Sequence, residues 1–379
     1  MALPEEFRLV SYLSQWEHVV HYPLSSSYPE SLSVNELLVH AGERDRADLF
    51  EAPLDYMPIR GGPRLRQAIA ATYDTLGPDD VMAFAGADEA LNAAFQALLE
   101  PGDHAIVTVP AYQSLEALPA ASAAVTAVPL DPHRGWTLDL DRLRDAVRPN
   151  TRVVVVNAPH NPTGTVPSRE TFDAVVALCR RHGLWLLSDE VYRGLEYDAA
   201  DRLPQAADAY ERGISLNVMS KAYGLPGLRI GWLATRTEKV LDRAERAKQY
   251  MSICNANMSE TLAAVALDAR GSILDAVIRR ARSNLTRLDA VLSAHPTVFD
   301  WVPPRAGVLA FPRYKGREGA EAFAARLVEE TGILVVPSTV YRSTLAEVPG
   351  DRLRIGFGRR TLDAAAGRLG DWLSGQPAP

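Results

Sequence analysis

The sequence predicts an α/β fold in which a mostly parallel sheet forms a large domain and a smaller α/β domain follows. Apolar stretches rich in β-branched residues alternate with helical patterns over residues 86–189, which is typical of successive βαβ units. After about residue 235 the pattern changes to long helices, and then to short strands mixed with helices. The 379 residues are too many for one small core, and 47% hydrophobic with 23% charged residues is an ordinary globular composition.

The predicted large domain begins with a helix over residues 63–75, which Pro63 opens at a first-turn position. A glycine turn at Gly86 then leads into an Ala- and Leu-rich helix that ends before Pro101. The following elements alternate in type, and their strands are apolar enough for burial on both faces: strand 104–110, helix 138–148, strand 152–157, helix 168–182 and strand 184–189.

Beyond residue 235 the periodicity predicts long helices over residues 237–250, 259–269 and 272–294. The predicted elements of the remaining chain are strands 308–311, 333–336 and 353–357 and helices near 318–330 and 361–374. We therefore predict three parts: an N-terminal arm (1–40) that joins the small domain, a large domain (41–285) and a small domain (286–379). One continuous domain is the alternative.

Charge and composition argue against several classes of protein. A net charge of −7 disfavours a surface for nucleic acid or an anionic membrane, and no apolar run approaches the roughly 18–20 residues of a membrane helix. The acidic start lacks the basic and apolar regions of a signal peptide, so we expect none. Cys179 and Cys254 lie far apart without metal-ligand spacing, so we expect no disulfide, no metal site and a cytoplasmic location.

Two polar segments follow buried strands of the predicted sheet. Residues 156–164 place Asn161 in an Asn-Pro-Thr-Gly turn directly after one strand, and residues 187–192 place Asp189 at the end of the next. Ligands of parallel sheets bind outside the carboxyl ends of the strands. A buried carboxylate there requires a cationic partner. The alternatives are an ordinary turn and a strand-end carboxylate that faces water.

A lysine and a glycine turn supply the complementary groups. Lys221 lies in a glycine-rich segment eight residues before Arg229, an arrangement that suits an amine nucleophile beside an anion-binding group. At Gly86-Ala87-Asp88 the start of a helix offers free N–H groups to a phosphate. The chain has four lysines, and we expect the other three to be solvated charges: Lys239, Lys248 and Lys315.

A reactive lysine, a strand-end aspartate and a phosphate-binding helix terminus are the groups that proteins supply to pyridoxal 5′-phosphate (PLP). With these motifs in this order, residues 45–360 resemble the fold-type I PLP-dependent enzymes of the class I/II aminotransferase family. The resemblance implies the PLP transferase fold, with the mostly parallel sheet in an α/β/α sandwich. It also implies PLP as cofactor, an amino-acid or amino-acid-derived substrate, and a homodimer with active sites at the subunit interface.

The resemblance implies a role for each matching residue. Lys221 and Asp189 are implied to be catalytic, the first as the lysine that forms a Schiff base with PLP and the second as the partner of the pyridine nitrogen. Asn161 and Tyr192 are implied to hydrogen-bond the phenolic oxygen of the ring. Tyr112 is implied to stack on the ring and to act in catalysis, with core packing as the alternative.

The phosphate of PLP is implied to be bound by residues of several segments: Gly86, Ala87, Asp88, Ser220, Arg229 and, from the neighbouring subunit, Tyr56. Val218 stands where most relatives carry a serine or threonine that binds the phosphate, so we expect that contact to be either missing or supplied by Asn217 or Ser220. Arg354 is implied to grip the substrate carboxylate, with Ser26 and Asn161 beside it; a surface arginine is the alternative.

These residues imply an enzyme that acts at Cα of an amino acid, and they leave the reaction open. Residues 12–17 and 22–27 are similar to the arm of capreomycidine synthase-like enzymes of actinobacterial natural-product pathways. We expect aminotransferase-type chemistry in such a pathway, with β-elimination, cyclisation or oxidative, decarboxylating deamination as alternatives. Glu17 is a candidate partner for a cationic substrate side chain, or simply a helix-surface carboxylate.

Two rival classes are disfavoured. A non-catalytic regulator with the PLP fold would carry an added DNA-binding domain, but residues 1–40 are too few for one and are not basic. An NAD-binding Rossmann enzyme would carry the pattern G-x-G-x-x-G after its first strand, and the sequence lacks this motif.

Overall fold

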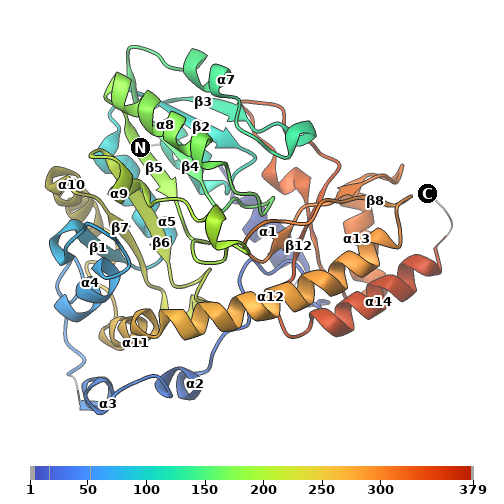
Figure 1. The fold of residues 1–379 in the computed structure, drawn as a ribbon, viewed down its shortest axis with the longest axis horizontal. Helices are drawn as coiled ribbons and strands as arrows, with labels where there is room; N and C mark the ends of the chain where they lie inside the picture. Colours follow the sequence, from blue (N-terminus) through green and yellow to red (C-terminus); the bar gives the residue numbers. More distant parts are fainter. Residues whose placement is uncertain (1–4, 17, 52, 377–379) are drawn as a thin grey trace.

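The computed structural model of the protein describes residues 5–16, 18–51 and 53–376, and its fold confirms the predicted class. At its centre lies a seven-stranded sheet (Figure 1) with the order β1-β7-β6-β5-β4-β2-β3. β7 is antiparallel to both of its neighbours, and the other adjacent pairs are parallel. The strands are β1 (Val81–Phe84), β2 (His104–Val109), β3 (Ala124–Pro129), β4 (Thr151–Asn157), β5 (Trp185–Asp189), β6 (Gly213–Val218) and β7 (Gly231–Ala234).

Helices cover both faces of this sheet, because alternate residues of a strand point to opposite faces. In β4, Val155 packs in a cluster with residues of α5 (Ala87–Leu98) and α10 (Glu238–Gln249). The adjacent Val154 packs on the other face, with residues of α8 (Arg169–His182). The apolar run of β4 is therefore buried on both sides.

A long helix, α12 (Arg270–Ser293), leads from the large sheet to a smaller α/β region (Figure 1). This region contains the three-stranded sheet β11-β12-β9 and the strand pair β10-β8. The predicted domain boundary at residue 285 falls inside the continuous helix α12, and the division into domains stays a prediction. The other elements of the region are β8 (Phe299–Asp300), β9 (Leu309–Ala310), β10 (Arg313–Tyr314), α13 (Ala320–Thr331), β11 (Val336–Pro337), β12 (Leu353–Gly356) and α14 (Leu362–Ser374).

The N-terminal arm pairs with the smaller region through its backbone. Tyr22 forms a parallel bridge with Ile333, and the N–H of Gly356 in β12 donates to the carbonyl of Leu24. Beyond these contacts the arm reaches Ser27, which lies beside the carboxyl ends of the large sheet. The small sheet therefore holds the N-terminal arm in a position where Ser27 lies against residues of the large sheet.

Shorter helices complete the chain: α1 (Arg8–Trp16), α2 (Val34–Leu38), α3 (Glu43–Glu51), α4 (Pro63–Ala70), α6 (Ser114–Ala120), α7 (Leu140–Asp145), α9 (Ala206–Ala209) and α11 (Asn257–Asp268). Glu17, discussed above as a partner for a cationic substrate, lies outside the described residues. In the part of the chain that the structure describes, no helix is long and apolar enough to cross a membrane. Those same residues contain no group of three potential metal ligands.

Helix α4 ends at Ala70, earlier than the predicted end at residue 75. The carboxylate of Asp208 accepts hydrogen bonds from the backbone N–H groups of Asp74 (3.1 Å) and Thr75 (2.9 Å). The Gln205 side chain donates to the carbonyl of Thr72 (2.9 Å). These long-range contacts take the backbone groups that a continued helix would use, so the helix stops.

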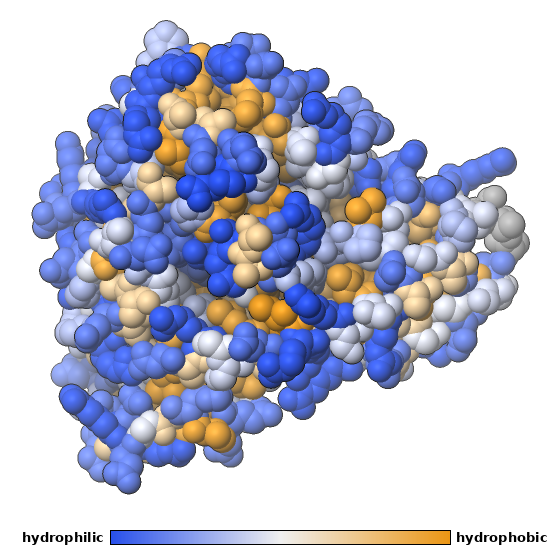
Figure 2. Space-filling view, viewed as in Figure 1, coloured by the Kyte–Doolittle hydropathy of each residue, from blue (hydrophilic) through white to orange (hydrophobic). Residues whose placement is uncertain are grey.

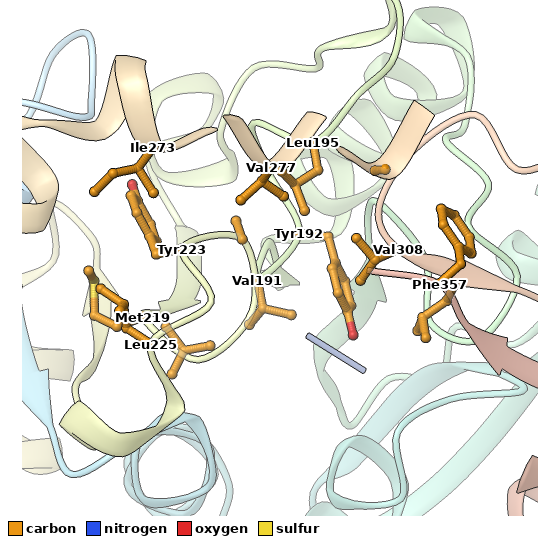
Figure 3. Packing of buried hydrophobic residues seen from close by; sticks show 14 of the residues in the cluster. Val191, Tyr192, Leu195, Met219, Tyr223, Leu225, Ile273, Val277, Val308 and Phe357 are labelled. Atoms are coloured by element: carbon orange, nitrogen blue, oxygen red, sulfur yellow. The ribbon is translucent and has the colours of Figure 1, made fainter. Parts of the chain in front are cut away.

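Apolar side chains from α12 pack against the segments that carry the polar motifs (Figure 3). Ile273 and Val277 of this helix face Tyr223 and the chain after β5. The ring of Tyr192 lies in the same cluster, while its hydroxyl points away from α12. The cluster therefore fixes one end of the Tyr192 ring, while the hydroxyl at the other end donates to the carbonyl of Ser27 (2.8 Å).

The expectation that Lys248 is a solvated charge is wrong. Its side chain is fully buried, and Nζ donates to Glu89 Oε2 (3.2 Å), Ser252 Oγ (2.9 Å) and Asn255 Oδ1 (3.0 Å). Lys248 continues the buried face of α10, eight residues after Val240, and this helical spacing was the signal in the sequence. Lys239 and Lys315 are exposed.

Candidate active site

A cavity of about 220 Å³ lies at the carboxyl ends of β4 and β5 and beside the start of α5. It brings together most of the residues that the sequence singled out: Ala87, Asp88, Tyr112, Asn161, Asp189, Tyr192, Ser220, Lys221 and Arg229. Its other lining residues are Ser27, Tyr28, Leu91, Val191, Val218 and Pro226. Segments separated by up to two hundred residues therefore meet at the edge of the sheet where parallel strands bind ligands.

Asn157, the last residue of β4, ties the two strand ends together. Its Nδ2 donates to the carbonyl of Asp189 (2.9 Å), and its Oδ1 accepts from the backbone N–H of Asn161 (2.7 Å). Both strand-end residues of the site are thus held by one buried amide. Asn157 was not among the predicted site residues. Its position as a polar residue at the end of an apolar strand could have indicated a role in the site.

Asp189 and Lys221 are both buried in this cavity, and burial shifts both groups toward their neutral forms. Burial raises the pKa of Asp189 to about 7, against the opposing effects of the Val191 N–H and the Lys221 charge. Burial, together with the charge of Arg354, lowers the pKa of Lys221 to about 8. Near neutral pH the Lys221 amine is therefore unprotonated far more often than that of an ordinary lysine, and a nucleophile requires this unprotonated state.

The N-terminal arm supplies a direct partner for this lysine. Lys221 Nζ donates to Ser27 Oγ (2.6 Å), and the hydroxyl of Tyr192 donates to the carbonyl of Ser27 (2.8 Å). Ser26, which the sequence analysis placed at the substrate, does not line the cavity; its carbonyl lies against Gly356. Nothing in the run Ser25-Ser26-Ser27 distinguishes the residue that faces the lysine, because that depends on how the arm pairs with the small sheet.

Tyr112 closes one side of the cavity with its ring. Its hydroxyl donates to Asp88 Oδ2 (3.0 Å), and Ser114 Oγ donates to Asp88 Oδ1 (2.7 Å). The ring packs against that of Phe7, with centroids 5.3 Å apart. Burial and the Asp88 charge raise the pKa of Tyr112, so its phenol remains a protonated hydrogen-bond donor. Asp88 and Phe7 thus fix the ring's position.

The start of α5 forms an open anion-binding turn. Among the residues that the structure describes, no side chain caps this helix, so its first N–H groups and its positive end are available to a ligand. Gly86 has φ +100°, and a Cβ there would overlap Nη2 of Arg229. A glycine is therefore required for the guanidinium to lie against the turn.

Ser220 and Asn217 were the two candidates for the contact that Val218 cannot make. Ser220 lines the cavity, and its hydroxyl lies 3.5 Å from Arg229 Nη1. Asn217 instead accepts the N–H of Val218 with its own Oδ1 (2.8 Å) and is not among the lining residues. The geometry therefore favours Ser220.

Arg354 and Tyr56 lie outside the cavity lining, for different reasons. Arg354 is 1% exposed; its Nη1 donates to the hydroxyl of Tyr341, and its Nη2 donates to the carbonyl of Ser25 (2.6 Å). A buried position excludes the alternative of a surface arginine. Tyr56 is 81% exposed on the single chain, and its predicted contact requires a second subunit.

An amine with a lowered pKa, a buried carboxylate and an uncapped helix start beside an arginine fit the ring and phosphate of PLP. This fold and this set of groups define a PLP-dependent enzyme of fold type I. The chain belongs to the aminotransferase class I and II family, whose model matches residues 24–369. PLP is the cofactor of the family, and the predicted cofactor and class of enzyme are confirmed.

Comparisons with individual proteins agree with this assignment. The chain is 35% identical over 344 residues to capreomycidine synthase of Streptomyces vinaceus, covering 88% of this chain and 86% of that protein. A PLP-dependent aminotransferase from Streptococcus suis superposes with a TM-score of 0.91 at 29% identity, over 99% and 98% of the two chains. The PLP-dependent cyclase OrfR superposes with a TM-score of 0.86 at 28% identity, also over 99% and 98%. The predicted family resemblance is confirmed.

We expect Gly86→Ala to weaken PLP binding at least tenfold, because the new methyl group displaces the Arg229 guanidinium from the turn. Loss of a hydrogen bond from a charged group costs about 1.5–3 kcal/mol, which is tenfold or more in affinity. Gly102→Ala is the matched control, because Gly102 has φ +94° and no atom of the described residues lies within 4 Å of the position of its missing Cβ.

Both variants should lose about 1–2 kcal/mol of folding stability from the positive φ. Thermal unfolding measures that loss, and absorbance titration measures the dissociation constant of PLP. An unchanged dissociation constant in Gly86→Ala, or an equal increase in Gly102→Ala, would contradict the assignment of the turn.

Proposed function

We propose that this enzyme binds PLP through Lys221 and transfers the amino group of a free α-amino acid to a 2-oxo acid. The observation that carries the proposal is the meeting of the Lys221 amine, the buried Asp189 carboxylate and the α5 turn in one cavity. When bound, PLP supplies an electron sink for the pair left by a broken bond to Cα. The protein residues bind and orient the partners and move the proton.

Asp189 and Lys221 have complementary tasks in this proposal. The Asp189 carboxylate would accept a hydrogen bond from the protonated ring nitrogen of PLP, and Asn157 holds the strand end that carries this carboxylate. The Lys221 amine would take the proton from the substrate Cα as a general base, and its protonated form would then donate that proton to another carbon of the reacting molecule as a general acid. Its lowered pKa of about 8 suits both directions of that transfer near neutral pH.

Arg354 is the proposed site for the substrate carboxylate. Its guanidinium is buried and makes no ion pair with a carboxylate of the residues that the structure describes, and its Nε has no hydrogen-bond partner. A buried charge without a counter-ion is costly, so an anionic ligand at this position is favourable. The planar fork of arginine suits a carboxylate.

Cyclisation is the second candidate reaction, and two of the similar proteins support it. The chain is similar along most of its length to a protein named capreomycidine synthase and to a solved cyclase. In this alternative the α-amino group stays on the product and the β or γ carbon changes. A β-elimination would likewise begin with loss of the Cα proton, so the three outcomes share their first half.

The reaction is tested by incubating the purified holoenzyme with a panel of free amino acids in D₂O. We expect exchange of the Cα proton by NMR with the true substrate, and a 2-oxo acid when a 2-oxo acid acceptor is present. The matched control is Lys221→Ala, which should abolish both signals, with Lys239→Ala unaffected because Lys239 is exposed. A product that keeps its α-amino group supports cyclisation instead, and absence of Cα exchange with every amino acid contradicts the proposal.

We also propose that the enzyme is a cytoplasmic homodimer. Exposed apolar side chains lie on neighbouring segments: Val34, Val39, Phe50, Leu54, Tyr56, Tyr250, Ile253 and Met258. The side chain of Asn257 donates to the carbonyl of Pro53 (3.1 Å), and α11 packs against α2 and α3. Apolar residues are visible where α2 lies (Figure 2). An exposed apolar patch of this kind supports a protein interface.

The dimer proposal predicts a specific loss in Tyr56→Phe. If the Tyr56 hydroxyl reaches the phosphate bound by the partner, removing it costs about 1.5–3 kcal/mol, which weakens PLP binding roughly ten- to a hundred-fold. Tyr250→Phe is the control and should bind PLP normally; Tyr250 is 92% exposed and lies between α10 and α11. Dilution should dissociate the dimer and release PLP. Analytical sedimentation measures the dissociation of the dimer. A monomer that retains PLP, or a Tyr56→Phe variant with unchanged affinity, would contradict the proposal.

A further inference from the structure

We propose that Tyr341 is a positioning residue that fixes the amide of Asn161, so that its NH₂ group faces the bound cofactor. The inference rests on the proposed function and adds a residue that the sequence motifs do not single out. Tyr341 ends a short 3₁₀ turn, η5 (Ser338–Tyr341), in the smaller region. It lies far along the sequence from Asn161, and the packing of that region against the large sheet brings the two together.

The hydroxyl of Tyr341 lies between two residues of the site. It donates to Oδ1 of Asn161 (3.0 Å) and accepts from Nη1 of Arg354. The side chain is buried, and its ring packs edge-to-face on Phe311 with centroids 6.0 Å apart. A phenylalanine would make the same ring contacts, so packing alone does not require the oxygen. Burying a hydroxyl is favourable only when it is hydrogen-bonded, as it is here.

The directions of these two hydrogen bonds follow from the chemistry of the partners. A guanidinium can only donate, so the phenolic oxygen must accept from Arg354. The single hydrogen of the phenol is then free for Asn161, and the atom that receives it must be the amide oxygen. Burial raises the pKa of Tyr341, so the phenol keeps that hydrogen near neutral pH.

This arrangement removes the freedom of Asn161 to turn its amide over. With Oδ1 held by Tyr341 and the backbone N–H held by Asn157 (2.7 Å), Nδ2 is the group left for the cavity. Asp189, Tyr192 and Lys221 line the same cavity. An N–H donor there stabilises an anionic ring oxygen, whereas an amide oxygen would repel it.

The test uses the visible absorbance of the reconstituted holoenzyme, which needs no turnover. The pH midpoint of its spectral change reports the proton shared between Lys221 and the ring oxygen. We expect Tyr341→Phe to raise this midpoint by about half a unit to one unit, since one oriented hydrogen bond to the anionic oxygen is lost. Asn161→Ala should raise it at least as much.

A double-mutant cycle separates positioning from a structural effect. If Tyr341 acts through Asn161, adding Tyr341→Phe to Asn161→Ala should produce no further shift. Tyr314→Phe is the control, because Tyr314 is also buried in the smaller region but its hydroxyl donates to Glu318 (2.7 Å). It should leave the midpoint unchanged, and thermal unfolding should confirm that each variant is folded.

Two results would overturn the inference: a normal midpoint in folded, PLP-loaded Tyr341→Phe, or shifts that add in the double variant. Failure of the proposed function looks different. If the unaltered protein shows no pH-dependent visible band with PLP, the cofactor assignment fails, and the role of Tyr341 fails with it.

Discussion

The site depends on the burial of two opposite charges, the Asp189 carboxylate and the Lys221 amine, in one cavity at the edge of the sheet. Burial pushes both groups toward neutrality, so each is poised to change its protonation state near neutral pH. Burying two such groups costs free energy of folding because both lose their hydration. This cost is useful where a bound ligand interacts with both groups. Contacts from the neighbouring strands, helices and the N-terminal arm hold the two groups in the cavity.

Three kinds of contact provide that support. Asn157 joins the ends of β4 and β5 and so fixes Asp189 relative to the turn with Asn161. Gly86 lets the Arg229 guanidinium lie against the uncapped start of α5. The arm brings Ser27 to the lysine because its backbone pairs with the small sheet. The carboxyl ends of the large sheet thus carry Asp189 and Asn161, while the smaller region holds the arm that brings Ser27 to the cavity.

Sequence reasoning reached the fold class and most cavity residues because both depend on local signals. Apolar runs identify buried strands, and polar residues at their carboxyl ends identify the ligand edge; Asp189 and Asn161 were found in this way. The roles of Ser27 and Tyr341 depend on which residue of a distant segment packs against the site. The sequence around Ser27 does not indicate this, because the two residues before it are also serines. Lys248 is buried although it is charged, because it lies on the same face of α10 as the buried residues Val240 and Ala244.

The most direct test of this account is the pH dependence of cofactor uptake by Lys221. PLP is added to the cofactor-free protein between pH 6 and 11, the product is reduced with borohydride, and the modified lysine is mapped by mass spectrometry. Because the nucleophile is the unprotonated amine, uptake should rise with pH to a midpoint near 8, with the adduct on Lys221. An adduct on Lys239, Lys248 or Lys315, or a midpoint near the ordinary lysine value of about 10.4, would contradict the account.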